Sequence, residues 1–155
     1  MIRSEGKKMI KKWMKHFAEY IGSKNVWTLS LEDKVIDIEF ATSLKSRCRG
    51  LMGRTIPQRL LLIPNCKCVH TFGMSCPLTI YALNSRLKIC AKKDSLVPNR
   101  IWGSLHAQYI LEVPTHLKIT NEELRKIHRF IFTKIVGSKK EMMSYMEKEY
   151  ESFKS

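Results

Sequence analysis

Residues 27–40 have the sequence WTLSLEDKVIDIEF, the clearest strand pattern in this chain of 155 residues. Apolar residues at positions 27, 29 and 31 alternate with polar ones, and the alternation returns at positions 36, 38 and 40. A period of two is typical of strands that bury one face. Glu32 and Asp33 lie between the two runs and can turn the chain. We therefore predict a β-hairpin with one buried face.

After the hairpin, the sequence predicts one short helix and then further strands. Thr42 can cap a helix over residues 43–52, which Gly53 would end. Strands are expected at residues 66–71, 78–83, 87–91 and 108–113. Residues 98–103 contain a proline and a glycine and indicate a long irregular connection before the last strand.

The residues before the hairpin predict a basic amphipathic helix. From Met9 onward, apolar residues recur at intervals of three and four, at Ile10, Trp13, Met14, Phe17, Tyr20 and Ile21. Lysines at positions 7, 8, 11, 12 and 15 occupy the other side, and Gly22 with Ser23 can end the helix. Such a helix either packs on its own domain or binds a membrane surface or a partner.

The last forty residues change to intervals of three and four, which is typical of helices. Thr120 with Glu123, and Ser138 with Glu141, each match the Ser/Thr-x-x-Glu capping box. Apolar stripes follow each box, at positions 124, 127, 131 and 135 and at positions 142, 146, 150 and 153. Because Gly137 separates the stripes, we predict a C-terminal pair of helices that packs on the sheet or on a partner.

These patterns divide the chain into three parts. Residues 1–24 form the basic helix, 25–115 the sheet domain and 116–155 the helical extension. A hydrophobic share of 44% with 27% charged residues is ordinary for a globular protein and disfavours wholesale disorder. The longest aliphatic run, residues 60–63, is far shorter than the roughly 20 apolar residues of a membrane span, so we predict no transmembrane segment.

The charge is strongly positive, with 28 Lys and Arg against 14 Asp and Glu and a net charge of +14. Residues 1–25 carry seven positive and two negative side chains, the densest excess in the chain. Weak nonspecific contact with an anionic membrane surface or with nucleic acid is therefore expected. Plain surface charge is the alternative interpretation.

The five cysteines, an odd number, favour reduced thiols over a disulfide framework. The N-terminal residues carry positive charge but lack the apolar stretch of a secretory signal. We expect a cytoplasmic protein, with peripheral membrane contact as a second option. Either Met1 or Met9 can be the true start.

Several fragments in the middle of the chain share one order with a known family. They are Ala-Thr at 41–42, RCRGLMGR at 47–54, VHTFGM at 69–74 and Leu-Glu-Val at 111–113. Together they resemble domain-of-unknown-function family 192, over residues 26–115. The resemblance implies a small, mostly antiparallel, β-barrel-like α+β domain of bacteria and archaea without an established reaction.

One position departs from the pattern of this family. The family usually has an aspartate two residues after the proline that follows the methionine motif, and here Thr79 follows Pro77. If the missing carboxylate normally pairs with Arg47 or Arg54, Glu112 is the obvious substitute, because an unpaired buried charge is costly.

Polar side chains in and near these motifs predict a ligand-binding cleft. The candidates are Arg47, Arg54, His70, Thr71, Met74 and Glu112. Guanidinium groups beside a hydroxyl and an imidazole would suit a carboxylate or another small anion. The alternative for each of them is a structural role.

A zinc site at Cys66, Cys68, His70 and Cys76 is a weaker hypothesis. Residues two apart on a strand lie roughly 6.5–7 Å from each other, whereas sulfurs on one zinc ion lie about 4 Å apart. We predict no metal and no cofactor. Cys66 or Cys76 could also form a nucleophile pair with His70, although no acidic residue lies near in sequence to orient the imidazole.

These observations favour a non-catalytic binding or accessory module for a small anionic ligand or a protein partner. The first alternative is a basic protein that adheres to anionic membrane or nucleic acid through its N-terminal helix. The second is a Cys/His-dependent enzyme.

Overall fold

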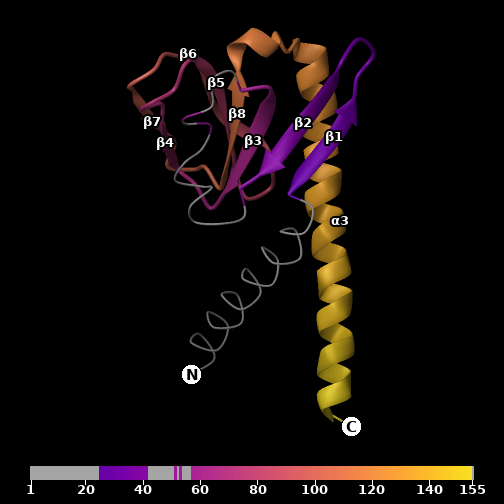
Figure 1. The fold of residues 1–155 in the computed structure, drawn as a ribbon. Helices are drawn as coiled ribbons and strands as arrows, with labels where there is room; N and C mark the ends of the chain where they lie inside the picture. Colours follow the sequence, from indigo (N-terminus) through magenta and orange to yellow (C-terminus); the bar gives the residue numbers. More distant parts are fainter. Residues whose placement is uncertain (1–24, 42–50, 52, 54–56, 155) are drawn as a thin grey trace.

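A computed structural model describes residues 25–41, 51, 53 and 57–154 of the chain (Figure 1). The predicted N-terminal helix and the predicted helix over residues 43–52 lie outside these residues, apart from Leu51. The described part is an α+β fold, as the sequence predicted, with eight strands, one short 3₁₀ helix and one long α-helix.

The predicted hairpin is confirmed. Strand β1 (Val26–Ser30) pairs antiparallel with β2 (Val35–Phe40), and the backbone amide of Leu31 donates to the Lys34 carbonyl oxygen across the turn, at 2.8 Å. The alternating residues Ile36, Ile38 and Phe40 are buried, as a period of two requires of a strand with one apolar face.

Six further strands follow the hairpin: β3 (Arg59–Pro64), β4 (Cys68–His70), β5 (Leu78–Leu83), β6 (Ile89–Leu96), β7 (Ile101–Gly103) and β8 (Tyr109–Pro114). Strands β4, β5, β6 and β8 overlap the predicted ones, whereas β3 and β7 were not predicted. Strand β7 falls within the predicted irregular connection. It exists because three residues pair antiparallel with β4, a long-range contact that leaves no local pattern.

Gly103 in β7 is required by this pairing. A Cβ at that position would lie 2.5 Å from the carbonyl oxygen of Lys67 and 3.2 Å from Cα of Cys68. Both are backbone atoms, so neither can move aside without opening the pair. The glycine that indicated a loop in the sequence instead lets two backbones approach closely.

The main sheet has the order β1-β2-β3-β8-β5-β6, in which only β2 and β3 are parallel. The prediction of a barrel-like sheet is wrong, because β1 and β6 remain edges and do not pair. Strands β4 and β7 form a separate two-stranded sheet, which lies on the opposite side of the main sheet from the long helix (Figure 1).

The central strands show why the main sheet stays open. Residues 60–63 of β3 are all buried, and so is every residue of β8. A strand buried on both faces needs a layer on each side, whereas barrel strands alternate between an interior and an outside. The helix covers one face and the small sheet helps to cover the other, so two cores form.

The two cores divide along each strand by alternation. The helix-side core includes Leu60, Leu62, Leu111 and, from the helix, Ile127 and Ile131. The opposite core includes Leu61, Ile63, Leu78, Ile80 and Ile110, with Val69 of β4. Leu51 also belongs to the opposite core. Each sheet face is thus closed by segments distant in sequence.

The prediction of a C-terminal helical pair is also wrong. One helix, α3 (Asn121–Lys154), runs through Gly137 without a break and contains 34 residues. A glycine inside a helix costs only about 1 kcal/mol relative to alanine, too little to end a helix whose neighbours favour it. At 1.5 Å per residue, α3 is roughly 51 Å long, and its second half extends beyond the sheet (Figure 1).

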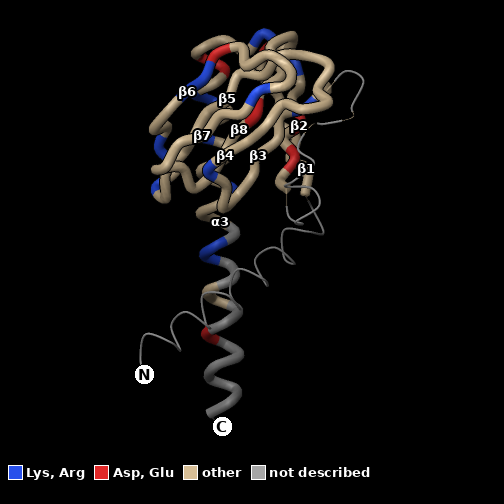
Figure 2. The backbone as a smooth tube through the Cα atoms, turned by 90° about the vertical axis from the view of Figure 1, so that its left-hand side faces the viewer, with Lys and Arg blue, Asp and Glu red and all other residues tan. Residues whose placement is uncertain are grey.

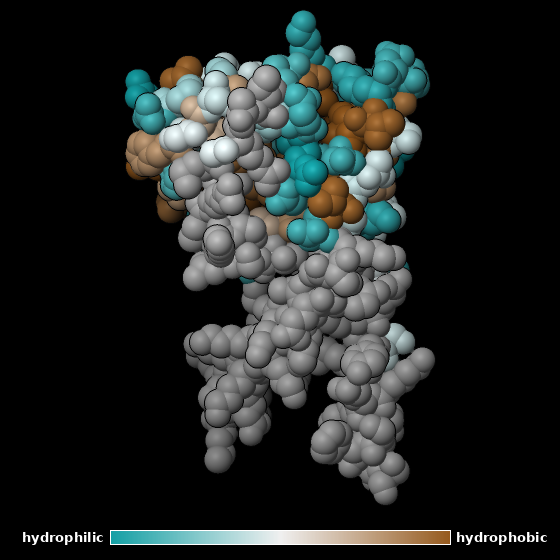
Figure 3. Space-filling view, in the orientation of Figure 1, coloured by the Kyte–Doolittle hydropathy of each residue, from teal (hydrophilic) through white to brown (hydrophobic). Residues whose placement is uncertain are grey.

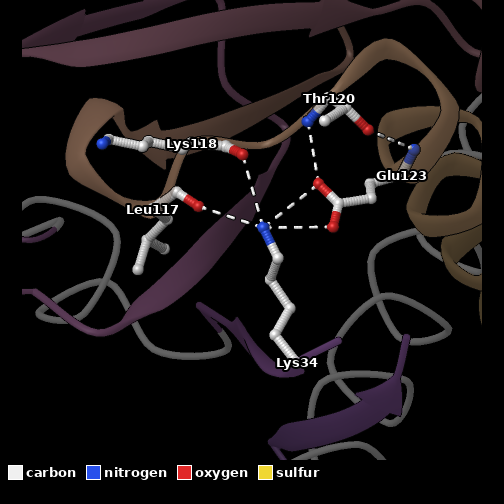
Figure 4. A network of polar contacts seen from close by, with 5 residues as sticks. All are labelled: Lys34, Leu117, Lys118, Thr120 and Glu123. Atoms are coloured by element: carbon white, nitrogen blue, oxygen red, sulfur yellow. Dashed lines mark hydrogen bonds and ion pairs between the residues drawn. The ribbon is translucent and has the colours of Figure 1, made fainter. Parts of the chain in front are cut away.

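The start of α3 confirms the first predicted capping box. The backbone amide of Thr120 donates to Oε2 of Glu123 at 2.8 Å, and the amide of Glu123 donates to Oγ1 of Thr120 at 3.2 Å. Lys34, from the hairpin turn, forms an ion pair with Glu123 at 3.1 Å (Figure 4). Its ammonium group also donates to the carbonyl oxygens of Leu117 and Lys118. The cap therefore joins the hairpin to the helix.

These contacts predict a pH-dependent contribution to stability. The amide of Thr120, and then Lys34, hold the pKa of the Glu123 carboxyl below its usual value of 4.5. A lowered carboxyl pKa stabilises the folded state above pH 4.5, and this stabilisation disappears as the pH falls through the folded-state pKa. We expect Glu123→Gln to remove that part of the acid-induced loss of stability, measured by urea unfolding between about pH 3 and 6.

The matched control for this prediction is Glu122→Gln. Glu122 is exposed and lies in the same first turn of the helix, but it does not cap the amide of Thr120. Equal pH profiles of the two variants would contradict the assigned role of Glu123.

Candidate functional site

The two segments that meet at the small sheet are held together by the side chain of Thr71. This residue follows β4, is 1% exposed, and its hydroxyl donates to the Val97 carbonyl oxygen at 2.7 Å. The same oxygen accepts the backbone amide of Arg100 at 3.0 Å. The backbone of Thr71 adds two hydrogen bonds. Its amide donates to the Arg100 carbonyl oxygen, and its carbonyl oxygen accepts the Asn99 amide. Thr71 thus fixes residues 97–100 against β4.

Side chains on the outer surface of the small sheet form a mixed apolar and cationic patch. We call it the outer patch; its residues are His70, Phe72, Val97, Arg100 and Ile101. Phe72, Val97 and Ile101 are 44%, 46% and 63% exposed, and His70 and Arg100 are exposed as well. Apolar atoms reach the surface on the side of the molecule where Figure 1 places β7 (Figure 3).

The geometry places three of these side chains, those of His70, Phe72 and Ile101, on one surface. His70 and Ile101 are directly opposite in the β4–β7 pair, and opposite residues of an antiparallel pair point to the same face. The ring of Phe72 stacks on that of His70, with centroids 5.1 Å apart and planes 28° apart. The hydrogen bonds of Thr71 hold the backbones of Val97 and Arg100 against the end of β4, and the side chains of both residues are exposed there.

The charge of this region has one sign. Residues 65–76 and 97–106 contain Lys67 and Arg100, two histidines and no Asp or Glu. The guanidinium of Arg100 donates to the Asn99 carbonyl oxygen at 3.0 Å and is otherwise exposed. An anionic group next to an apolar one would therefore be complementary to the outer patch.

Of the predicted cleft residues that the structure describes, Thr71, Met74 and Glu112 are buried and His70 is exposed. Thr71 and Met74 are buried in one turn, where the Met74 amide donates to the Thr71 carbonyl oxygen at 3.2 Å. Glu112 is 2% exposed in β8, opposite Leu61 and Ile80.

His70, by contrast, is exposed, because its neighbour Val69 is the β4 residue that faces the core. His70 therefore points away from the core that includes Val69. Arg47 and Arg54 lie outside the described residues.

Three residues of the outer patch had no role in the sequence-based prediction: Val97, Arg100 and Ile101. Their segment contains no strand period and was interpreted as a connection. The sequence offered one signal: residues 65–76 and 97–106 combine Lys or Arg with apolar residues and contain no Asp or Glu. That signal needs the β4–β7 pairing before it acquires a meaning.

The predicted zinc candidates, Cys66, Cys68, His70 and Cys76, do not converge in the structure. Within residues 25–41, 51, 53 and 57–154, no three His, Cys, Asp or Glu side chains gather where they could hold a metal ion. The thiol of Cys66 donates to the Cys68 carbonyl oxygen at 3.2 Å. Burial raises the pKa of the Cys76 thiol, the opposite of what a nucleophilic thiolate requires.

The fold and the outer patch define a small α+β protein with an open sheet, two cores and an exposed patch of apolar and cationic side chains. This chain belongs to domain-of-unknown-function family 192, described as an uncharacterised ACR, whose model matches residues 27–121. The resemblance deduced from the sequence motifs is therefore confirmed. No curated protein matches the chain.

Two solved structures are similar to the chain. One is a protein of unknown function from Novosphingobium aromaticivorans DSM 12444, with 17% identity over 60% of this chain and 77% of that one, at a TM-score of 0.47. The other is a proposed transcription regulator from Sinorhizobium meliloti 1021, with 20% identity over 61% and 85%, also at 0.47. In the part of the chain that the structure describes, no helix is both long and apolar enough to span a membrane.

Proposed function

We propose that the protein is a non-catalytic binding module that docks an acidic segment of a partner protein on the outer patch. The observation that carries this proposal is that the exposed residues Phe72, Val97, Arg100 and Ile101 come from two segments that the buried hydroxyl of Thr71 holds together. Single exposed apolar residues are ordinary, but three of them on two adjoining segments are what an interaction site would expose.

Rigidity of the patch supports binding over a structural role alone. The Thr71 side chain and backbone make hydrogen bonds to Val97, Asn99 and Arg100, so the loop that carries two of the five patch residues is held in place without a partner. A preordered surface loses less conformational entropy on binding. The odd number of five cysteines favours reduced thiols, which supports a cytoplasmic location for this role.

The proposal can be tested by NMR with the full chain and a defined probe. The probe is a capped five-residue peptide of three glutamates separated by leucine and phenylalanine. We expect amide signals of residues 67–72 and 97–103 to shift on titration. Arg100→Glu should lower the affinity for the peptide about tenfold, because it places a carboxylate opposite the glutamates of the peptide.

The matched control is Arg86→Glu, which makes the same charge change at an exposed turn away from β4 and β7. It should leave the peptide affinity within about twofold. Shifts confined to other strands, or no shifts at all, would contradict the proposal. Equal responses to peptide and to sodium acetate would identify a small anion as the ligand.

Surface adhesion is the second candidate, favoured by the net charge of +14. Lys and Arg are distributed over the whole described backbone (Figure 2). An adhesive protein would sediment with vesicles containing phosphatidylserine, and salt would release it. In that case Arg86→Glu and Arg100→Glu would weaken sedimentation equally, whereas docking on the outer patch distinguishes them.

A further inference from the structure

The hydrogen bonds of the hairpin fix which backbone groups of β1 face outward. At the turn, the backbone amide of Leu31 donates to the Lys34 carbonyl oxygen. At the open end of the hairpin, the amide of Phe40 donates to the Asn25 carbonyl oxygen. Hydrogen-bonded and non-hydrogen-bonded pairs alternate along an antiparallel ladder, so these two bonds identify every second pair of the register as hydrogen-bonded. The odd-numbered residues of β1 therefore bond to β2, and the even-numbered ones do not.

The even-numbered residues of β1 are Val26, Thr28 and Ser30. Their amides and carbonyl oxygens point away from β2, along the outer edge of the main sheet (Figure 1). Among the described residues, no hydrogen bond reaches these backbone groups. A strand that joined this edge would therefore meet a row of donors and acceptors.

The long helix does not cover this edge. It packs beneath the sheet between two contacts. On one side, Phe130 contacts Trp27 of the hairpin, with ring centroids 6.5 Å apart. On the other side, a ring nitrogen of His128 contacts the carbonyl oxygen of Leu87, in the turn after β5. The helix thus lies beneath the sheet and not beside β1, and the side chain of Thr28 is exposed.

The edge strand at the opposite end of the sheet is protected, whereas β1 is not. Natural edge strands commonly carry lysines and bulges, which hinder the addition of a further strand. Strand β6 has both: Lys92 and Lys93 are exposed, and its register with β5 shifts at two places. Ser95 of β6 also has a φ of 47°. Strand β1 pairs with β2 in unbroken register over its five residues and contains no charged residue, proline or glycine.

We propose that β1 pairs antiparallel with β1 of a second copy of this chain, so that two main sheets form one continuous sheet. The two-fold axis would be perpendicular to the sheet and pass through Thr28. In this register Thr28 lies opposite Thr28 of the second copy, and Val26 lies opposite Ser30 of the second copy. These are the residues whose backbone groups face outward, so each of the three pairs would exchange two hydrogen bonds.

The side chains of β1 fit the same register. On the helix side, the half-buried Trp27 would lie opposite Leu29 of the second copy, and pairs of an aromatic and an apolar side chain stabilise sheets. On the other face, Thr28 would meet Thr28 of the second copy, and pairs of threonines are also favourable. Because the interface is symmetric, the pair of Trp27 and Leu29 would occur twice.

The distribution of charge favours a second copy as the occupant of this edge. Each chain has a net charge of +14, so two copies repel wherever their basic surfaces meet. Residues 25–31 contain no charged side chain. Two copies can therefore join at β1 without placing like charges opposite each other, and an acidic strand would gain no ion pair with β1. The outer patch takes no part in this pairing, so the two proposals stand or fall separately.

Sedimentation equilibrium of the full chain, over a wide range of concentration, tests the pairing. We expect wild type to dimerise. Thr28→Pro should raise the dissociation constant of the dimer about thirtyfold, because both hydrogen bonds at the two-fold axis lose their donor. Proline is tolerated in an edge strand where the amide faces solvent, so the monomer should fold. Ser30→Pro should weaken the dimer to a similar extent. The matched control Thr28→Val keeps the amide and should leave the dissociation constant within about threefold.

Hydrogen exchange identifies the edge that pairs. The amides of Val26, Thr28 and Ser30 should exchange about tenfold or more slowly at high protein concentration than at low concentration. The amides of Trp27 and Leu29 bond to β2 and should be protected at both concentrations. This alternation in wild type decides the question even if a proline variant does not fold.

Four results would overturn the proposal. The first is a wild type that stays monomeric up to about 1 mM. The second is a dimer that the folded proline variants leave unchanged, with protection of the β3 and β8 amides as the criterion of folding. The third is a loss of dimer that is equal in Thr28→Val and Thr28→Pro. The fourth is protection of the Thr28 amide that does not depend on concentration, because another segment of the same chain would then cover the edge.

Discussion

Replacing Ile131 with alanine is expected to lower the free energy of unfolding by about 2–5 kcal/mol. The side chain is fully buried in the helix-side core, together with Ile127 and Ile135 from the same helix and with Leu60 and Leu111 from the sheet. The loss combines the lost burial of three carbons with the cavity that they leave between helix and sheet. Urea unfolding monitored by circular dichroism measures the change.

The matched control is the next residue on the helix. Phe132 is 46% exposed, so Phe132→Ala should cost less than about 1 kcal/mol, although it removes more atoms. Similar losses for the two variants would mean that α3 does not pack on the sheet as the structure shows. The expected difference implies that the first half of α3 and the main sheet unfold together.

Thr71→Val should lower the free energy of unfolding by about 2–4 kcal/mol, a decrease of about 5–15 °C in the melting temperature for a chain of this size. Valine has nearly the same shape but cannot donate to the Val97 carbonyl oxygen or accept the Arg100 amide. Each polar group left buried without a partner costs about 1–3 kcal/mol. Thermal unfolding gives the measurement.

Two variants make this result specific. Thr28→Val removes an exposed hydroxyl that donates to Asp37 at 2.8 Å, and it should change stability by less than about 0.5 kcal/mol. Thr71→Ser keeps the hydroxyl and should retain most of the stability. If Thr71→Val were as stable as wild type, the loop of residues 97–100 would not depend on this hydroxyl, and the rigid outer patch would lose its basis.

Some of the fold follows from the residues themselves. The hairpin from Trp27 to Phe40 was predictable because its alternation records which face is buried, and its turn is only a few residues long. The capping box of Thr120 and Glu123 was predictable because both groups bond within one helical turn. The second such motif, at Ser138, lies inside a continuing helix, which shows that the motif alone does not begin one.

The candidate site was harder to predict. Thr71 and Glu112 were identified as important polar residues, and both are buried. His70 was expected in the same cleft, but its strand places it on the exposed surface beside Phe72. The patch residues Val97, Arg100 and Ile101 come from a segment without periodicity and could not be recognised from their neighbours in the chain.

Local pattern was enough to establish the α+β class, the hairpin, most of the strands, the start of the long helix and, through its motifs, the family. These features depend on contacts within a few residues, which leave a period or a spacing in the chain. The open sheet, the β4–β7 pair and the outer patch were decided by tertiary structure. They depend on which distant segments cover each face of β3 and β8. His70 and Ile101 are about thirty positions apart, and nothing in the sequence around either residue indicates that the two pair.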